Sequence, residues 1–314
     1  MVIRRVGELG VDGIGRAGRQ RDDENLIICL KTRSAEYALD AGRLTVRCAW
    51  KGREETAFEG RRIFIDDDAW LAVCPGSTVY CRIAADREID SLTILYRPGF
   101  AESVLESLLT PPDRLLMRGP GENASLLPFA PQLQPHDRTV TPVLLFIKRH
   151  CEMGIADDLW YEEQLAFLVE RLLLRHRQVV ATAQAIPARR AATRREIMRR
   201  IALATDYIHS AYDRPISLDD LAGAACLSRH HFLRLFKAVH GITPQELLQR
   251  KRTLAAARLL QDERFSVEDV VRRVGFDSRS TLFRALRRFH GVTPRECRRS
   301  HAVASNALAA YAAA

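Results

Sequence analysis

The sequence lacks the features that mark a membrane protein or a disulfide-rich secreted protein. No apolar run approaches the roughly 18 residues that cross a bilayer, and no signal peptide opens the chain. The seven cysteines are odd in number and none forms a C-x-x-C pair, which favours reduced thiols in a reducing compartment. We therefore expect a soluble, cytoplasmic protein without membrane contact.

Histidine is missing from the start of the chain, and His136 is the first to occur. A metal-dependent barrel enzyme needs His and carboxylate ligands clustered on its strands, so the sequence predicts no metal, no cofactor and no catalytic residues. The run 66–68 (Asp-Asp-Asp) fits a solvated turn better than a ligand set. His230 and His231 are adjacent on an expected helix and point about 100° apart, which makes sharing a metal difficult. We expect a protein that is not an enzyme.

Positive charge is concentrated in one part of the chain. The 314 residues suffice for about two domains of ~150 residues each, and the formal net charge is +9. Residues 189–300 carry 24 Lys and Arg against 12 Asp and Glu, a balance of +12, so the remainder has a balance of −3. This distribution indicates a nucleic-acid-binding module attached to a nearly neutral domain.

The first half of the chain changes from a strand pattern to a helix pattern. Short apolar or alternating segments separated by turn signals predict a small β-barrel or sandwich. We expect strands at 25–31, 44–50, 63–65, 69–74, 78–83 and 92–96, and turns at 40–42, 66–68 and 75–77. Helical periodicity follows at 98–109, 141–153 and 157–177, and the last two suit an antiparallel helical hairpin.

Two groups of residues in the expected barrel leave alternatives open. Trp50, Phe64, Trp70 and Tyr80 line an apolar effector pocket or fill the core. The thiols of Cys74 and Cys81 face each other across a hairpin and sense oxidants, or they are buried and inert. Packing is the commoner role for both groups.

A repeated pattern carries the functional argument. Two segments, 217–246 and 266–296, match at an offset that grows from 49 to 50 residues. The matching pieces are Ser217–Leu221 with Ser266–Val270, Ser228–Lys237 with Ser278–Arg287, and His240–Glu246 with His290–Glu296. A duplicated supersecondary unit is far less frequent by chance than a single helical hairpin.

Each copy reads as a helix, a short turn and a second helix. Ser217 and Ser266 can cap the first helix, with an aspartate three residues later to complete a capping box. The turn falls at Cys226 in one copy and at Gly275 in the other; glycine adopts a positive φ freely and cysteine does not. This is the arrangement whose second helix enters the major groove of DNA.

The second helices end at Gly241 and Gly291. Thr-Pro-x-Glu capping boxes then begin at Thr243 and Thr293. The first box opens an expected helix of ~17 residues, about 25 Å long. A rod of that length would hold two recognition helices about one DNA turn apart.

The outward faces of the two second helices are basic or polar. Arginine can pair in bidentate fashion with guanine, and His, Ser and Thr read base edges less selectively. The candidate DNA contacts are Arg229, His230, Arg234 and Lys237 in the first copy, and Arg279, Ser280, Thr281, Arg284, Arg287 and Arg288 in the second.

Over residues of about 194–300 the chain resembles the AraC/XylS family of bacterial transcription regulators. The second copy carries the pattern Gly275-Phe276, Ser278, Leu282, Arg284, Leu286, Phe289 and Gly291-Val-Thr-Pro294. The resemblance implies base contacts from the second helix of each unit, which adds Leu233 to the candidates as an apolar residue that touches a thymine methyl or packs. It also implies an N-terminal barrel that binds an effector and dimerises.

We therefore expect an α+β multidomain chain with a small, cupin-like N-terminal β-barrel and helical hairpin, followed by an all-α domain of two helix-turn-helix units joined by a linker helix. The expected parts are an effector-sensing and dimerisation domain at 1–181, a linker at 182–193, the DNA-binding domain at 194–300 with units at about 217–239 and 266–289, and a frayed tail at 301–314.

The expected function is a sequence-specific transcription regulator, in the first place an activator. Its expected partners are double-stranded DNA at adjacent major grooves, RNA polymerase, an unknown small molecule and a second copy of the chain. Two alternatives use the same DNA-binding module: an alkylation-response repair enzyme, for which the scattered thiols have the wrong spacing, and a general nucleoid-binding protein, which would not discriminate between sequences.

Overall fold

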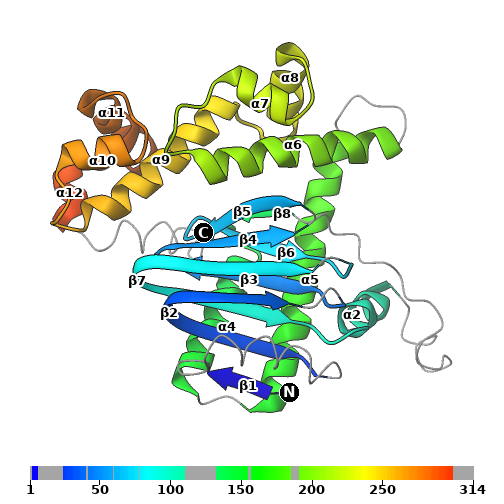
Figure 1. The fold of residues 1–314 in the computed structure, drawn as a ribbon. Coiled ribbons are helices and arrows are strands. Elements are labelled where there is room, and N and C mark those ends of the chain that lie inside the picture. The colour runs from blue at the N-terminus through cyan, green and yellow to red at the C-terminus, as the bar shows by residue number, and fades with distance from the viewer. Residues whose placement is uncertain are drawn as a thin grey trace. The chain divides into compact units, whose positions relative to one another are not determined.

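A computed structural model describes residues 2–5, 24–39, 42–58, 60–76, 78–109, 132–154, 157–184 and 191–299. The chain divides into two compact units, Met1–Gln178 and Val179–Ala314, and each is described by itself (Figure 1). The expected frayed tail at 301–314 lies outside the described residues. None of the described helices has the length and apolar character needed to cross a bilayer.

The N-terminal unit is a near-closed antiparallel barrel with helices packed against it (Figure 1). Its strands are β1 (Val2–Arg5), β2 (Leu26–Leu39), β3 (Thr45–Trp50), β4 (Arg53–Phe58), β5 (Arg61–Asp66), β6 (Ala69–Val73), β7 (Val79–Leu95) and β8 (Gln132–Pro135). The order is β1-β2-β7-β3-β6-β8, with β4 pairing β5 and β7. Among the described strands, β1 pairs with β2 in parallel and the other pairs are antiparallel. The expected barrel is confirmed.

Strand β7 closes the barrel because it pairs with two different strands, β4 and β3, along the same edge. Its first half pairs β4 at residues 80–82 and its second half pairs β3 at residues 90–95, while β2 runs along nearly its whole length. The sequence predicted two separate strands here, at 78–83 and 92–96, which is wrong. Between them, Ile89, Asp90 and Ser91 also pair with β2, although the register shifts between Thr32 and Ser34. Backbone hydrogen bonds to β2 do not require an apolar side chain.

The strand order also decides one of the two open alternatives in the barrel. β6 pairs β3 and β8, and β3 separates it from β7, so Cys74 and Cys81 do not face each other across a hairpin. Cys81 is buried, and burial raises the pKa of its thiol to about 12. Trp50 and Trp70 are buried core residues, whereas Tyr80 is 61% exposed.

The described part of this unit also contains the helices α2 (Phe100–Leu109), α4 (Thr141–Met153) and α5 (Asp158–Gln184). One face of α4 and one of α5 are buried, through Val143, Leu144, Ile147, Cys151, Tyr161, Leu165, Leu168, Val169 and Leu172. The Tyr96 hydroxyl at the end of β7 donates to the Leu165 carbonyl at 3.4 Å. The barrel and α5 up to Gln178 therefore belong to one compact unit.

The C-terminal unit is all-helical over its described residues. Its helices are α6 (Ala191–Ala211), α7 (Leu218–Ala224), α8 (Arg229–His240), α9 (Pro244–Leu260), α10 (Val267–Arg273), α11 (Arg279–His290) and α12 (Pro294–Arg299). The expected linker at 182–193 is partly helical: α5 runs to Gln184, α6 begins at Ala191, and residues 185–190 lie outside the described part.

Two hydrophobic cores divide this unit. The first joins α6, α7 and α8 around Phe232 and Phe236, and Leu248 of α9 belongs to it. The second joins the later part of α9 to α10, α11 and α12 around Leu282 and Leu286. Figure 1 shows the two helix-turn-helix units at opposite ends of α9, as the repeat predicts.

Candidate nucleic-acid interface

Matching capping boxes begin the two helix-turn-helix units. The hydroxyls of Ser217 and Ser266 each accept from the backbone N–H of the aspartate three residues later, at 3.1 Å. Asp220 and Asp269 in turn accept from the serine backbone N–H groups at 2.8 and 3.1 Å. The serine hydroxyls also donate to these carboxylates, at 2.7 and 2.6 Å, and this bond, followed by the backbone one, lowers the pKa of both carboxyls. Both boxes expected from the sequence are confirmed.

The turn of each unit is built from the same pair of hydrogen bonds. In the first, the N–H groups of Cys226 and Leu227 bond back to the carbonyls of Gly223 and Ala222; in the second, those of Gly275 and Phe276 bond back to the carbonyls of Arg272 and Val271. This is the Schellman arrangement, which requires a positive φ at its penultimate residue. Cys226 has φ 49° and Gly275 has φ 77°.

Reciprocal substitutions at these two turns should have opposite effects on stability. Cys226→Gly should raise the free energy of unfolding of the C-terminal unit by about 0.5–1 kcal/mol. Glycine has no Cβ, so it adopts the left-handed backbone conformation of residue 226 without the strain that cysteine has there. Gly275→Ala should lower it by about 1–3 kcal/mol, since the new Cβ would lie 3.1 Å from the Asp213 carbonyl. Denaturation followed by circular dichroism tests both; equal shifts of one sign would contradict the argument.

The expected recognition helices expose the side chains chosen from the sequence. α8 buries Phe232, Leu235 and Phe236, and α11 buries Leu282, Ala285 and Leu286. The exposed candidates are Arg229, His230, Arg234, Lys237, Arg279, Ser280, Arg284, Arg287 and Arg288, and the half-buried ones are Leu233 and Thr281. The Thr281 hydroxyl lies 2.9 Å from that of Ser278, which caps the helix, so it is already engaged.

Each recognition helix begins with an arginine held by an acid of the preceding helix. Arg229 pairs with Asp219 at 3.1 Å, and Arg279 pairs with Glu268 at the corresponding position of the second copy. These pairs are exposed and contribute little stability, but they restrict where the guanidinium groups lie. Sequence reasoning missed Asp219 and Glu268; the signal was an acid repeated at the position after the first helical residue.

Phe283 of α11 is a third residue missed from the sequence. It is 43% exposed and directly precedes Arg284, on the outward side of the helix. The repeat aligns it with Leu233 of α8, so the offset of 50 residues was the available signal.

The linker helix α9 ties the second unit to the first. The Arg252 guanidinium is buried and donates to the carbonyls of Tyr212 and Arg214, just after α6, at 2.7 and 2.8 Å. Burial lowers the pKa of Arg252, and the nearby carboxylates of Asp277 and Asp213 oppose that shift. The Tyr212 side chain packs against both cores. The two recognition helices are therefore mounted on one joined scaffold.

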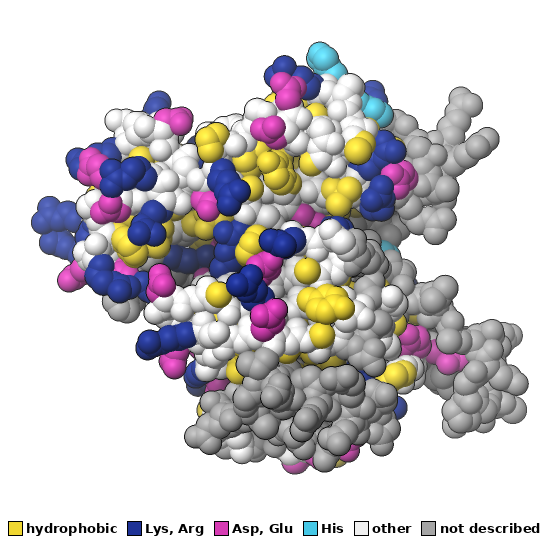
Figure 2. All heavy atoms as spheres, viewed as in Figure 1, with side chains coloured by type: hydrophobic (Ala, Val, Ile, Leu, Met, Phe, Trp, Pro, Cys, Tyr) yellow, Lys and Arg dark blue, Asp and Glu magenta, His cyan; other side chains and the backbone are white. Residues whose placement is uncertain are grey.

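Basic side chains are dense on this unit. In Figure 2 the dark-blue Lys and Arg side chains gather over the end that carries α10, α11 and α12. Arg272, Arg279, Arg287, Arg288 and Arg298 belong to these helices, and Arg288 is 63% exposed in its side chain. A surface of this kind attracts the phosphate backbone of nucleic acid.

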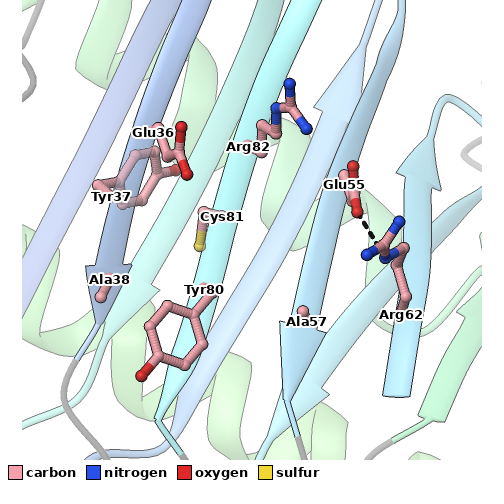
Figure 3. Close-up of a pocket in the computed structure, with 9 residues that line it drawn as sticks. All are labelled: Glu36, Tyr37, Ala38, Glu55, Ala57, Arg62, Tyr80, Cys81 and Arg82. Atoms are coloured by element: carbon pink, nitrogen blue, oxygen red, sulfur yellow. Dashed lines mark ion pairs between the residues drawn. The ribbon is translucent and has the colours of Figure 1, made fainter. Parts of the chain in front are cut away.

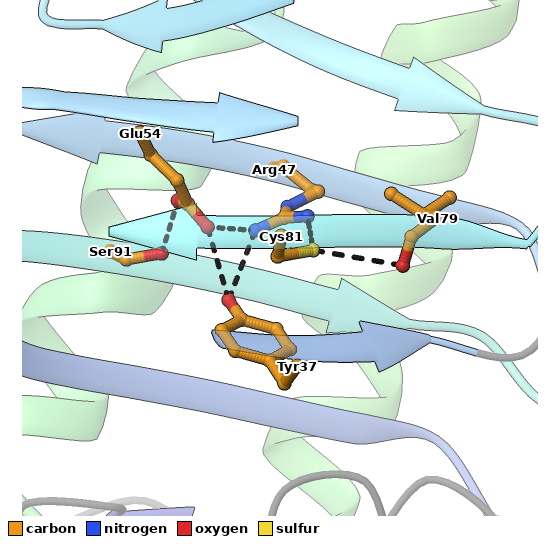
Figure 4. Close-up of polar contacts among 6 residues, drawn as sticks. All are labelled: Tyr37, Arg47, Glu54, Val79, Cys81 and Ser91. Carbon is orange, nitrogen blue, oxygen red and sulfur yellow. Dashed lines mark hydrogen bonds and ion pairs between the residues drawn. The ribbon is translucent and has the colours of Figure 1, made fainter. Parts of the chain in front are cut away.

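The N-terminal unit contains a cluster of hydrogen-bonded polar side chains inside its barrel (Figure 4). Arg47 and Glu54 form an ion pair with fully buried side chains. Tyr37 lies between them, 3.0 Å from Arg47 Nη2 and 3.1 Å from Glu54 Oε1, and Ser91 donates to Glu54 Oε2 at 2.9 Å. Arg47 also donates to the Cys81 sulfur. Only the Arg47 Nε has no hydrogen-bond partner within this cluster.

A hollow of about 400 Å³ lies on the outer wall of the same barrel (Figure 3). Charges of alternating sign cross it from strand to strand: Arg82 is paired in register with Glu36 and with Glu55, and Glu55 forms an ion pair with Arg62 at 2.8 Å. Tyr80 lies at its edge. The hollow is thus polar, unlike the apolar pocket considered from the sequence.

Comparisons with known proteins converge on the C-terminal unit. The family model described as a helix-turn-helix domain matches residues 221–300. The probable transcription factor PqrA of Proteus vulgaris is 32% identical over 83 residues, 26% of this chain and 68% of that protein. The probable transcriptional regulator LumQ of Photobacterium leiognathi is 34% identical over 92 residues, 29% of this chain and 37% of that protein. The match thus spans well under half of LumQ.

Solved structures of similar sequence cover the same part of the chain. An AraC-type transcriptional regulator from Chromobacterium violaceum is 28% identical, with a TM-score of 0.31, over 32% of this chain and 91% of that one. The DNA-binding domain of AdpA, solved with a target DNA, is 30% identical, with a TM-score of 0.27, over 37% of this chain and 93% of that one. With the duplicated helix-turn-helix units, the family model and the match to PqrA show that the chain belongs to the AraC/XylS family of helix-turn-helix, DNA-binding transcription regulators.

Proposed function

We propose that this regulator is sequence-specific and inserts α8 and α11 into adjacent major grooves of one duplex. The observation that carries the proposal is that both helices expose basic outward faces while α9 and Arg252 join their cores into one unit. Contacts from the many arginines to phosphates would supply most of the affinity, and the outward side chains of α8 and α11 the specificity.

The protected DNA site tests this architecture directly. The full chain should select a duplex from a random pool that contains two half-sites about 10 base pairs apart, one for each recognition helix. A single protected half-site, or equal affinity for random DNA at the same salt concentration, would contradict the proposal.

Individual base contacts can be separated from phosphate contacts. Arg284→Ala should weaken binding to the selected duplex by about 1–3 kcal/mol and relax base preference at one position. Arg264→Ala is the matched control: it removes an exposed arginine in the segment before α10 that pairs with Asp262, and should not change base preference. If Arg284→Ala weakens binding to all sequences equally, Arg284 contacts a phosphate.

For the N-terminal unit we propose effector sensing and dimerisation. Five apolar side chains are exposed on α4 and α5, at Phe146, Met153, Leu159, Phe167 and Leu174. Exposed apolar side chains of this kind suit a contact with a second copy. Leu159→Glu should shift the full chain towards monomer in sedimentation, and Tyr80→Glu, on the barrel wall, should not.

Effector binding should raise the melting temperature reported by tryptophan emission.

We further propose activation of transcription through RNA polymerase. A relative from Escherichia coli, RclR, is described as a transcriptional activator and is 35% identical over 82 residues. A reporter gene placed behind the selected duplex tests this part, and a fall in its expression when the protein is supplied would identify a repressor instead.

A further inference from the structure

We propose that Phe283 reads the 5-methyl group of a thymine in the half-site that faces α11. This inference rests on the proposed function and adds to it a specificity residue and the base it selects. None of the arginine contacts considered above would distinguish a thymine by its methyl group.

The position of Phe283 supports a contact outside the protein. It is 43% exposed, although burying a phenylalanine side chain is worth about 1.5–3 kcal/mol. The core-facing side of α11 is already filled by Leu282, Ala285 and Leu286. Phe283 is therefore not used to pack the second core, in contrast with the neighbouring Phe289.

The surroundings of Phe283 distinguish it from an apolar residue that is exposed by chance. Residues separated by one, four, five and eight positions share one helical face, which places Arg279, Ser280, Phe283, Arg284 and Arg287 together. All five are exposed. Phe283 is the single apolar member of this face, so it lies among the side chains that are aimed at base edges.

The chemistry of the major groove selects the base. Each base pair presents a distinct pattern there, and thymine alone adds a methyl group at C5. A phenyl ring has no hydrogen-bond donor or acceptor, so it cannot discriminate guanine, cytosine or adenine by their polar edges. Contact with the thymine methyl buries apolar surface on both sides and gives a preference for T at one position.

The corresponding residue in the first unit serves as an internal comparison. Leu233 of α8 occupies the same place in the repeat but is half-buried and shorter. We therefore expect a strong thymine requirement in the α11 half-site and a weaker one in the α8 half-site.

Deoxyuridine provides the test, because it keeps the thymine pairing edge and removes only the methyl group. In the duplex selected by the full chain, each thymine is replaced singly by deoxyuridine and the dissociation constant is measured at fixed salt. One position in the α11 half-site should lose about four-fold in affinity, the value of one buried methyl-sized group at ~0.8 kcal/mol. In Phe283→Ala that sensitivity should vanish, whereas Leu233→Ala should retain it.

The outcomes separate this inference from the function on which it rests. If no duplex is selected, the proposed sequence-specific function fails. If a duplex is selected and bound in an Arg284-dependent manner, but no uridine substitution in the α11 half-site weakens binding by the full chain, the reading of thymine by Phe283 is overturned. This measurement of the uridine-substituted duplexes uses the unsubstituted protein, so it does not depend on whether Phe283→Ala folds.

Discussion

Glu54→Gln should lower the free energy of unfolding of the N-terminal unit by about 3–5 kcal/mol, the cost of removing one member of a buried ion pair. The substitution leaves the Arg47 guanidinium charged inside the barrel, where its side chain has no exposed surface. It also weakens the acceptor for the Tyr37 and Ser91 hydroxyls. All three tryptophans, Trp50, Trp70 and Trp160, belong to this unit, so denaturation followed by tryptophan emission reports it selectively.

Glu55→Gln is the matched control, because it makes the same chemical change at the next residue of β4. Glu55 faces the outer wall and pairs with Arg62, whose side chain is 72% exposed, so its loss should cost less than about 1 kcal/mol. A double variant, Arg47→Met with Glu54→Leu, should recover much of the stability, since apolar replacement of a buried pair is often neutral or favourable. Equal losses for Glu54→Gln and Glu55→Gln would show that the buried pair is not held in a low-dielectric interior.

Arg252→Ala should destabilise the C-terminal unit by about 3–6 kcal/mol, because hydrogen bonds made by a charged group contribute about 1.5–3 kcal/mol each and two are lost. The carbonyls of Tyr212 and Arg214 would lose their donor. Protection against hydrogen exchange should fall in α10 and α11 and stay unchanged in α4, which belongs to the other unit. The same variant should lose the footprint over the second half-site before that over the first.

Arg250→Ala controls for loss of charge and helix propensity on the same helix. Arg250 is exposed and pairs with Glu246 one turn away at 2.9 Å, so its removal should change stability by less than about 1 kcal/mol. An Arg252→Ala protein that keeps full protection in α10 and α11 and covers both half-sites would mean that core packing alone aligns the recognition helices.

The acidic partners of Arg229 and Arg279 should reduce the affinity of this regulator for DNA of any sequence. Asp219 and Glu268 hold these guanidinium groups at the same place in both units. A phosphate or a guanine edge must compete with that carboxylate, so the free energy gained from each contact is reduced. Competition of this kind should lower affinity for every sequence, and under the proposed function we expect discrimination to depend more on Arg234, Arg284 and Phe283.

What the sequence determined by itself was local. Capping boxes at Ser217 and Ser266, glycines after the second helices and the two-fold repeat were all readable, because each depends on residues within a few positions of one another. They were enough to place α7, α8, α9, α10 and α11, and to name the exposed faces of the two recognition helices. Phe283 and the acids at 219 and 268 were present in the same repeat and were overlooked.

What only the tertiary structure decided depends on residues far apart in the chain. β7 is one strand because β2 pairs along it. β4, which the sequence did not predict, pairs with β7 at residues 80–82. Two contacts join segments that are separate in the sequence: the ion pair of Arg47 with Glu54, and the hydrogen bond of Arg252 to Tyr212 after α6. The pattern of apolar residues does not show that these segments lie close together. The physical reason is that hydrophobic patterns and caps act within one helix or strand, whereas closure of a barrel and burial of a charge depend on which segments meet.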